Sequence, residues 1–392
     1  MTTQAATSVK QRLLTPGPTA VPPQVLEELG QPIIHHRTKQ FQSIFGELCA
    51  QLQRLFQTEG PVMPIAGSGT TAYEAAQVSL TKPNSKVLTI ASGKFGERWQ
   101  EVYDAYGPYL GIEQLKINHD WGTPAPIAEI EQTLKDNPEI SVVTIVHSET
   151  STATCSDVKK VAELTQKTDA ILIVDGITSV GAFECQQDAW GIDVLVTGSQ
   201  KALMLPPGLG YVGLSERALK RLEAIEAAPC YNLDLRKWYK SWQKNDVPFT
   251  PPVSLIRAQK VALDMIEQEG LDIRIDRTKK LARATQAAFK AMGLSLISDS
   301  PSPSVTGAFY PEGSDDSIRG KLRDNHGIHI AGGQDGQGAK WKGKIFRLSH
   351  MGYVGPEDTR ACLEALDHEF KEAGASFNAG VAVDAFDKAY NG

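Results

Sequence analysis

Between about residues 60 and 215 the chain alternates short apolar runs with helical segments, and this alternation limits its fold more than any other feature. The apolar runs are nearly continuous, which is typical of strands buried on both faces of a parallel sheet. They lie at Lys86–Ile90, Ser141–His147, Ala170–Asp175 and Asp193–Thr197. The helical segments lie at Thr70–Leu80, Gly96–Tyr106, Ile127–Lys135 and Asp157–Gln166, the last with Asp157 as its N-cap. This order predicts an α/β domain with a mostly parallel sheet.

The pattern changes after Pro206-Pro207-Gly208, where the chain becomes more helical. Further helices are predicted at Ser254–Gly270, Leu271–Ala291, Ile318–His326 and Pro356–Ala373, with strand-like pieces at Ser304–Phe309 and Lys344–Leu348. We therefore expect a smaller α+β domain in the C-terminal part. The predicted division is an N-terminal extension (1–14), a large domain (15–255), a small domain (256–375) and a C-terminal tail (376–392).

Composition narrows the class of protein. The 392 residues are 41% hydrophobic and 22% charged, which excludes collagen-like, disordered and coiled-coil chains. The net charge of −6 argues against a nucleic-acid binder or a protein that docks on anionic membranes. Residues 1–10 lack the apolar core of a secretory signal, and no apolar run is long enough to span a bilayer. We expect a cytoplasmic protein.

The cysteines are few and scattered, at Cys49, Cys155, Cys185, Cys230 and Cys362. None forms a Cys-x-x-Cys pair, so the sequence supports neither a disulfide framework nor a cysteine-bound zinc or iron–sulfur site. His35-His36-Arg37 offers a second metal hypothesis, but it has no third ligand at a suitable spacing. No metal site is predicted.

Polar side chains follow three of the predicted strands, at the sheet edge where open α/β proteins bind ligands. Ser148-Glu149-Thr150 follows one strand, Asp175 closes the next, and Ser199-Gln200-Lys201 follows the third. A carboxylate in such an apolar place needs a partner, and a desolvated lysine there can form a Schiff base. From position alone, a buried Asp–Lys ion pair or two solvent-facing charges explain the pair equally well.

A glycine-rich turn, Gly67-Ser68-Gly69-Thr70, precedes the helix that ends at Leu80. Free N–H groups and the positive end of a helix dipole make such a turn a candidate phosphate site. The turn lacks the Gly-Lys-Ser/Thr ending of a Walker A loop and the full GxGxxG fingerprint. Taken alone, it is more simply explained as a helix cap.

Several motifs together resemble the class V aminotransferases. They are Thr15-Pro16-Gly17-Pro18-Thr19, the Gly-Ser-Gly-Thr turn, His147-Ser148-Glu149-Thr150-Ser151, Val174-Asp175-Gly176-Ile177-Thr178-Ser179-Val180-Gly181 and Gly198-Ser199-Gln200-Lys201-Ala202. The resemblance runs from about Arg12 to Ala373 and is strongest to the alanine–glyoxylate and serine–glyoxylate (serine–pyruvate) branch. Cyanobacterial relatives have carried the name soluble hydrogenase small subunit. The implied fold is type I of the pyridoxal-phosphate enzymes, with a seven-stranded type of sheet.

The resemblance also implies roles in binding pyridoxal 5'-phosphate. Lys201 would form the Schiff base with the cofactor and then act as general base, and Asp175 would pair with the pyridinium nitrogen. Phe95 would stack on the ring, where some relatives have tryptophan. The remaining cofactor contacts would come from Ser68, Gly69, Thr70, Thr150 and Gln200.

Substrate and partner contacts are implied in the same way. Arg347 would bind the substrate α-carboxylate, for which its planar fork is suited, although from position alone it reads as a structural ion-pair residue. The backbone at Gly17 would approach the substrate. The family forms homodimers, and Thr250 would complete the partner's phosphate site, although Val247 replaces a tyrosine that some relatives have nearby.

The predicted function is transfer of an amino group from alanine, serine or aspartate to a 2-oxo acid, with glyoxylate favoured, by a ping-pong mechanism. One alternative is a class V lyase or desulfurase, which would need a cysteine on a mobile loop; none of the five lies near residues 332–343. Another is a subunit of a soluble redox (hydrogenase) complex without pyridoxal phosphate, which would normally need cysteine-bound clusters.

Overall fold

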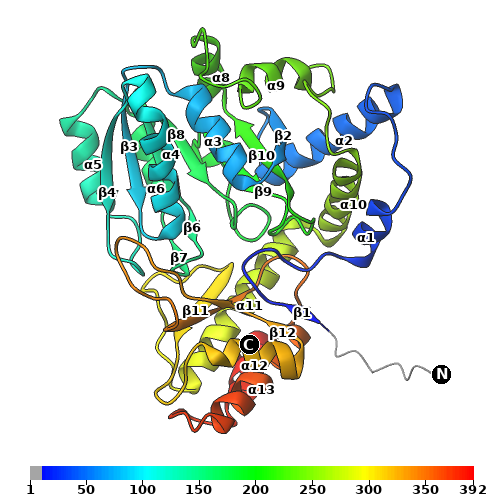
Figure 1. The fold of residues 1–392 in the computed structure, drawn as a ribbon, viewed down its shortest axis with the longest axis vertical. Helices are drawn as coiled ribbons and strands as arrows, with labels where there is room; N and C mark the ends of the chain where they lie inside the picture. The colour runs from blue at the N-terminus through cyan, green and yellow to red at the C-terminus, as the bar shows by residue number, and fades with distance from the viewer. Residues whose placement is uncertain (1–10) are drawn as a thin grey trace.

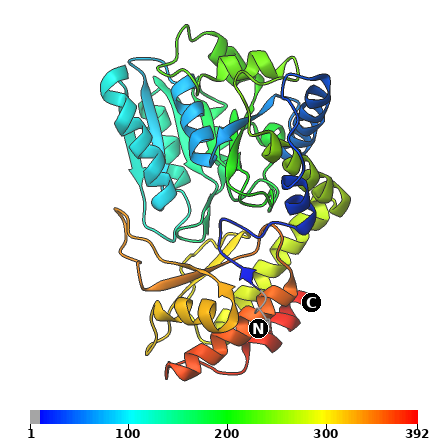
Figure 2. The ribbon, with the colours of Figure 1, turned by 45° about the vertical axis from the view of Figure 1, so that its right-hand side comes forward.

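The computed structural model describes residues 11–392. Residues 1–10, which hold most of the predicted N-terminal extension, lie outside the described residues. A large domain built around one sheet occupies the upper part of the molecule in Figure 1, and a smaller domain lies below it (Figures 1 and 2). None of the helices within residues 11–392 has both the length and the apolar composition needed to cross a membrane.

The large sheet has seven strands in the order β2-β10-β9-β8-β5-β3-β4. Their bounds are β2 Val62–Gly67, β3 Lys86–Ala91, β4 Glu113–Asn118, β5 Ile140–Val146, β8 Ile171–Asp175, β9 Val194–Gly198 and β10 Gly208–Leu214. Only β10 runs antiparallel to its neighbours in this sheet. The prediction of a mostly parallel seven-stranded sheet is confirmed.

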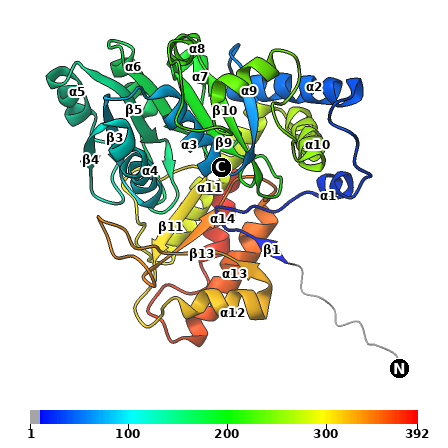
Figure 3. The ribbon, with the colours of Figure 1, turned by 45° about the horizontal axis from the view of Figure 1, so that its top comes forward.

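Helices cover this sheet, and they include the four predicted between its strands. Their bounds are α1 Pro23–Leu29, α2 Lys39–Phe56, α3 Gly69–Leu80, α4 Lys94–Leu110, α5 Ile127–Asp136, α6 Val158–Thr165, α7 Gln187–Trp190, α8 Glu216–Glu223, α9 Leu235–Trp242 and α10 Val253–Glu269. Asp157 caps α6 as expected, because its Oδ1 accepts the Lys160 N–H at 2.9 Å. Helices α1, α2 and α10 pack together at one side of the large domain (Figure 3).

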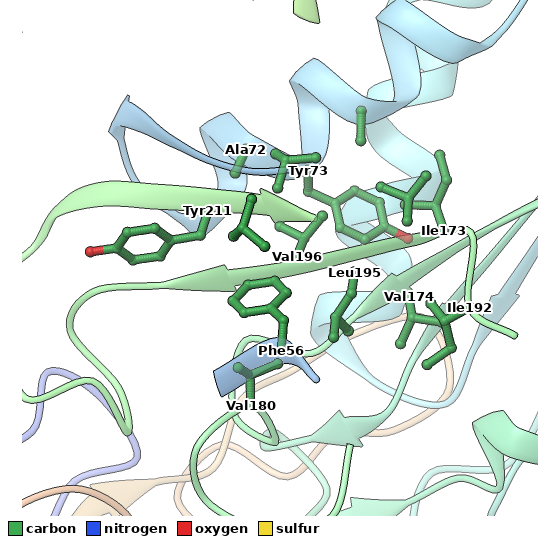
Figure 4. Close-up of a cluster of buried hydrophobic side chains, with 14 of the residues drawn as sticks. Phe56, Ala72, Tyr73, Ile173, Val174, Val180, Ile192, Leu195, Val196 and Tyr211 are labelled. Carbon is green, nitrogen blue, oxygen red and sulfur yellow. The ribbon is translucent and has the colours of Figure 1, made fainter. Parts of the chain in front are cut away.

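The large-domain core surrounds the central strands. Every residue of β8 and β9 is buried, which confirms the prediction of strands covered on both faces. Figure 4 shows Phe56, Tyr73 and Tyr211 packed around Leu195 and Val196. This core fixes the sheet edge at which the polar residues of the predicted site emerge.

The small domain is built on an antiparallel sheet in the order β11-β14-β13. Its strands are β11 Val305–Phe309, β13 Ala331–Gly332 and β14 Ile345–Ser349, and its helices are α11 Leu271–Ala291, α12 Ser317–His326, α13 Pro356–Glu372 and α14 Ala382–Asn391. A separate two-stranded ladder pairs β1 (Arg12–Leu13) with β12 (Ile328–His329), and a short hairpin joins β6 (Ser148–Glu149) to β7 (Thr154–Cys155). The smaller α+β domain is thereby confirmed.

Packing assigns three segments differently from the predicted division. Helix α10 contributes Ile256 and Leu263 to the large-domain core, so the chain passes to the small domain along α11 rather than near residue 255. Leu14, beside β1, belongs to the small-domain core. The predicted tail contains α14, whose Phe386 is fully buried in that same core.

Three strands of the large sheet were not predicted from the sequence. Strand β10 reads Gly-Leu-Gly-Tyr-Val-Gly-Leu, a glycine content that resembles a loop. Its Gly210 is required by close packing, because an added Cβ would lie 2.4 Å from the Ser68 carbonyl oxygen. Strand β4 lies at the sheet edge and is largely polar, and β2 contains a proline. These three strands could not be recognised from their local composition, because packing against neighbouring elements, rather than strand-forming residues, determines their structure.

Candidate active site

The predicted strand ends converge on one cavity in the large domain. Its lining includes eight of the predicted site residues, namely Ser68, Gly69, Thr70, Phe95, Thr150, Asp175, Gln200 and Lys201. Six further residues line it, namely Arg98, Trp99, Val146, Ser148, Ile177 and Thr178. The cavity lies beyond the carboxyl ends of β5, β8 and β9, where an open α/β sheet places its ligands.

Asp175 ends β8 as a buried and fully hydrogen-bonded carboxylate. Its Oδ2 accepts the indole N–H of Trp99 at 2.7 Å, and its Oδ1 accepts the Ile177 N–H at 2.8 Å. Burial raises the pKa of Asp175 to about 7, although both hydrogen bonds and the charge of Lys201 oppose that rise. The carboxylate is thus held ready for a protonated or cationic ligand.

Lys201 is enclosed between the large-domain sheet and the N-terminal segment. Its Nζ donates to the Pro16 carbonyl oxygen at 2.6 Å, and the charge of Asp175 opposes the effect of burial on its pKa. Burial lowers the pKa of Lys201 to about 8, with the charges of Arg347 and Arg98 acting in the same direction. A lysine in this state has a sizeable fraction of neutral, nucleophilic amine near neutral pH.

Gly17 lies against this amine. Its φ is +132°, and an added Cβ would lie 2.1 Å from the Lys201 Nζ. A side chain at position 17 would therefore both strain the backbone and displace the lysine. The structure brings Gly17 to the site, as the sequence predicted, although its contact with substrate stays a prediction.

Ser68, Gly69 and Thr70 form the N-terminal end of α3 at one side of the cavity. The Ser68 N–H donates to the Thr71 Oγ1 at 3.1 Å, which shapes the turn. Within residues 11–392, the buried Oε1 of Gln200 has no hydrogen-bond partner. The free N–H groups at this helix N-terminus are chemically suited to the oxygens of a phosphate group, whereas the Gln200 Oε1 can only accept a hydrogen bond.

An aromatic pair on α4 was only half predicted. Phe95 lines the cavity as expected, and the Arg98 guanidinium lies 4.8 Å from its ring centroid. Trp99 was missed, although it stacks on Tyr73 with ring centroids 3.7 Å apart and holds Asp175. Its position four residues after Phe95, on the same helical face, is the signal that could have found it.

Glu149 braces the turns around the cavity and was not singled out in the sequence. Its Oε2 accepts the N–H groups of Phe95 and Gly96, each at 3.0 Å. Its Oε1 accepts the N–H and the hydroxyl of Ser151, at 3.1 and 2.5 Å. Burial raises the pKa of Glu149, while these hydrogen bonds oppose the change. The carboxylate fixes the start of α4 beside Thr150.

Arg347 comes from β14 of the small domain and is 4% exposed. Its guanidinium donates to the Thr150 carbonyl oxygen at 2.5 Å and to the Gly332 carbonyl oxygen at 3.1 and 2.6 Å. The charge of Glu149 acts on Arg347 and favours its cationic form, but the hydrogen bonds of the guanidinium go to carbonyl groups. Desolvation lowers the pKa of Arg347 to about 10. A buried guanidinium held only by carbonyl groups is suited to a substrate anion rather than to a structural ion pair.

Thr250 is not in the cavity of its own chain. It is exposed in the segment between α9 and α10, so its predicted role in a partner's site stays a prediction.

His35 and His36 stack on each other between α1 and α2, with ring centroids 5.0 Å apart.

A group of possible metal ligands lies outside the cavity. Within residues 11–392, His326, His368 and Glu369 are the one set of three that lies close together. Glu369 Oε1 already accepts a hydrogen bond from Asn325 and shares one with the His326 ring, both at 2.9 Å. These bonds explain the group as a contact between α12 and α13. None of the five cysteines belongs to it.

The cavity therefore combines an anion-binding helix end, a buried carboxylate, an aromatic ring and a desolvated amine. These groups fit pyridoxal 5'-phosphate, with its phosphate, ring nitrogen, ring face and aldehyde. Together with the sheet order and the two domains, they define a pyridoxal-phosphate-dependent enzyme of fold type I.

Comparison with known proteins names the family. The family model described as Aminotransferase class-V matches residues 12–358, and the chain belongs to this family. It is 39% identical over 382 residues to the soluble hydrogenase 42 kDa subunit of Anabaena cylindrica, covering 96% of this chain and 97% of that protein. It is 32% identical over 351 residues to the L-aspartate–glyoxylate aminotransferase of Paracoccus denitrificans, covering 87% and 86%.

Among solved structures, the ureidoglycine–glyoxylate aminotransferase of Bacillus subtilis superposes with a TM-score of 0.91 at 29% identity. The superposition covers 99% of this chain and 100% of that structure. The chain is thus a transaminase of the class V type that uses pyridoxal 5'-phosphate.

Proposed function

We propose that this transaminase moves the amino group of a small amino acid (alanine, serine or aspartate) to a 2-oxo acid, with glyoxylate as the favoured acceptor. The observation that carries the proposal is Arg347, a buried guanidinium whose hydrogen bonds go to carbonyl groups and whose Nη1 contacts cavity residue Thr150. The names of the Paracoccus and Bacillus relatives support glyoxylate. Because donor and acceptor both carry a carboxylate next to the reacting carbon, one arginine would serve them in turn. Ping-pong kinetics follow if the cofactor keeps the amino group after the first product leaves and before the acceptor binds.

We assign the cofactor contacts as follows. Ser68, Gly69, Thr70 and Gln200 would hold the phosphate, Phe95 the ring face, and Thr150 a polar edge. The bound cofactor supplies an electron sink for the carbanion formed at the substrate Cα. The carboxylate of Asp175, fixed by Trp99 and Ile177, would accept a hydrogen bond from the protonated ring nitrogen.

Lys201 would carry the proton transfers. With a pKa of about 8 in the protein alone, its amine is poised to take a proton from the substrate Cα and return it. The Pro16 carbonyl oxygen and the bare backbone of Gly17 hold the Nζ at one place in the cavity. Both half-reactions use this one base, since each reverses the other.

We also propose a cytoplasmic homodimer. The exposed position of Thr250 is consistent with a contact to a partner's phosphate site, as the family resemblance implies. All five cysteines are free thiols, which suits a reducing compartment. Sedimentation of the purified protein tests the dimer: a monomer at micromolar concentration that is fully active would contradict it.

The Anabaena relative's name favours one second candidate, a subunit of a redox complex without pyridoxal phosphate. Against it, cluster binding would need several cysteines together, and within residues 11–392 no cysteine belongs to a group of three possible metal ligands. For a lyase or desulfurase, a cysteine is missing from residues 332–343.

A screen of half-reactions tests the proposal. The purified enzyme with bound cofactor is mixed with single amino acids, and conversion of the lysine-linked cofactor to its amine form is followed by absorbance. Alanine, serine or aspartate should convert it, and glyoxylate should reverse the change. Conversion by none of the three would contradict the proposal, and iron in stoichiometric amount without cofactor absorbance would favour the redox candidate.

A further inference from the structure

A hairpin of the small domain reaches across to the large domain. Residues 333–341, here called the 333–341 hairpin, lie between β13 and β14 and project towards the large domain as an orange loop in Figures 1 and 2. The Gly336 N–H donates to the Ala339 carbonyl oxygen at 3.1 Å. The backbones of Asp335 and Lys340 form an isolated antiparallel β-bridge. The hairpin is therefore an ordered turn rather than an open loop.

Its tip is held by one buried carboxylate of α4. Glu97 is 3% exposed, and its Oε1 accepts the Gln337 N–H of the hairpin at 2.9 Å. The same oxygen accepts the indole N–H of Trp121 at 3.2 Å. The Trp121 ring meets Trp341, at the end of the hairpin, edge-on with centroids 5.4 Å apart.

The hairpin backbone packs directly against Trp121 and Glu97. A Cβ added at Gly336 would lie 2.2 Å from the Trp121 ring and 2.6 Å from Glu97 Oε2. A Cβ added at Gly338 would lie 2.8 Å from the same ring. The absence of side chains at these two positions is what lets the backbone reach the carboxylate.

Both ends of this contact lead to the active site. Glu97 lies on α4 between Phe95, which lines the cavity, and Trp99, which holds Asp175. The hairpin begins directly after Gly332, whose carbonyl oxygen accepts two hydrogen bonds from Arg347. One carboxylate thus joins the helix that faces the cofactor to the segment that anchors the arginine.

We infer that Glu97 is a positioning residue that closes the 333–341 hairpin on α4 and so keeps Arg347 aligned with the cofactor cavity. The inference rests on the proposed function, in which Arg347 binds the substrate carboxylate. Glu97 does not touch the cavity itself, so its loss should loosen the carboxylate grip without removing the cofactor. The acceptor oxygen carries this role, because without it the buried indole N–H of Trp121 and the partly buried N–H of Gln337 would both lose their acceptor.

Three variants test the inference. Glu97→Ala removes the acceptor, and Glu97→Gln keeps an oxygen there. Glu101→Ala removes an exposed carboxylate of the same helix that pairs with Lys94 at 3.5 Å, as Glu97 Oε2 does at 3.7 Å. For Glu97→Ala we expect the KM for both donor and acceptor to rise on the order of tenfold, with a smaller change in kcat and an unchanged cofactor spectrum. Glu97→Gln and Glu101→Ala should stay within about threefold of the unmodified enzyme.

Hydrogen–deuterium exchange gives a readout that does not depend on activity. Amides of residues 334–341 should exchange at least about tenfold faster in Glu97→Ala and remain unchanged in Glu101→Ala. Unchanged exchange in Glu97→Ala would overturn the closure, and faster exchange with an unchanged KM would overturn the positioning role. Should Glu97→Ala not fold, Gly336→Ala displaces the hairpin from the other side and is expected to give the same two results. If the unmodified enzyme converts no amino acid, the proposed function fails, while the exchange data still decide the closure.

Discussion

The two ends of the active site are built in different ways. The cofactor end lies within one domain, where Asp175 and Glu149 are buried and fully hydrogen-bonded. The proposed substrate end is assembled across two domains, because Arg347 from β14 is held by the carbonyl oxygens of Thr150 and Gly332. The first end is preorganised by a rigid sheet, whereas the second depends on how the domains meet.

This difference separates two kinds of failure. A change at the cofactor end alters the chemistry of groups that hydrogen bonds hold in place, so its effect should fall mainly on kcat. A change at the substrate end alters the grip on a carboxylate, so its effect should fall on the binding of donor and acceptor together. Mutations at the two ends test whether the division holds.

The largest effect is expected for Lys201→Ala. Removing the amine placed to bond the cofactor and carry the proton should lower turnover by at least roughly 10³-fold. The visible absorbance of the lysine-linked cofactor should vanish, while circular dichroism remains that of a folded protein. Lys116→Ala, a surface lysine paired with Asp104, serves as control. Retained absorbance and normal turnover would show that the assignment of Lys201 is wrong.

Asp175→Asn should come next. A neutral amide cannot keep the ring nitrogen protonated, so we expect single-turnover proton abstraction to slow by about 10²–10³-fold while the cofactor still binds. Stopped-flow absorbance with saturating amino acid measures this step. If Asp175→Asn instead raises the KM and leaves the single-turnover rate unchanged, the proposal that Asp175 acts on the chemical step is wrong.

The same residue predicts a pH dependence for the cofactor-free protein. Folding raises the pKa of Asp175 from 3.8 to about 7, so the folded chain holds this proton more tightly than the unfolded chain. The contribution to stability is complete below the unfolded pKa and is lost as the pH rises through the folded one, by roughly 2 kcal/mol between about pH 5 and pH 7. Urea unfolding across this range should show the loss as a growing difference between the unmodified protein and Asp175→Asn, since both proteins share their other titrating groups. Parallel curves for the two proteins would contradict the prediction.

Arg347→Lys tests the substrate end and should have the smallest effect of the four. The charge remains, but the two-point grip is lost, at a cost of about 1.5–3 kcal/mol or roughly ten- to 150-fold in kcat/KM. Donor and acceptor should suffer alike, the cofactor spectrum should not change, and an amine without a carboxylate should be indifferent. Arg323→Lys, an exposed arginine of α12 paired with Asp324, is the matched control. Loss of the cofactor from Arg347→Lys would show that the arginine supports cofactor binding, and would contradict its assignment to the substrate carboxylate.

The same division explains what can be predicted from sequence. Strands β5, β8 and β9 carry their own apolar signal, so the residues that follow or close them, Asp175 and Lys201 among them, are recognisable from the sequence alone. Arg347 is assigned by resemblance alone, because no local pattern reveals that it reaches Thr150 from another domain. Trp99 could have been found from its spacing on the same helical face as Phe95, but its hydrogen bond to Asp175 could not. The hydrogen bonds of Glu149 to Phe95 and Gly96 likewise join residues distant in sequence and leave no spacing to read.

The position of Trp99 in the cavity wall, beside Asp175, has an optical consequence. An indole that lines the cavity lies within range of energy transfer to a bound chromophore absorbing in the near ultraviolet, so its emission should be quenched when pyridoxal phosphate is present. The hydrogen bond from its N–H to Asp175 makes the wavelength of that emission sensitive to the charge of the carboxylate. Subtracting the spectrum of Trp99→Phe would isolate this one fluorophore among the six tryptophans. The protein thereby contains its own probe of cofactor occupancy and of the ionisation of Asp175.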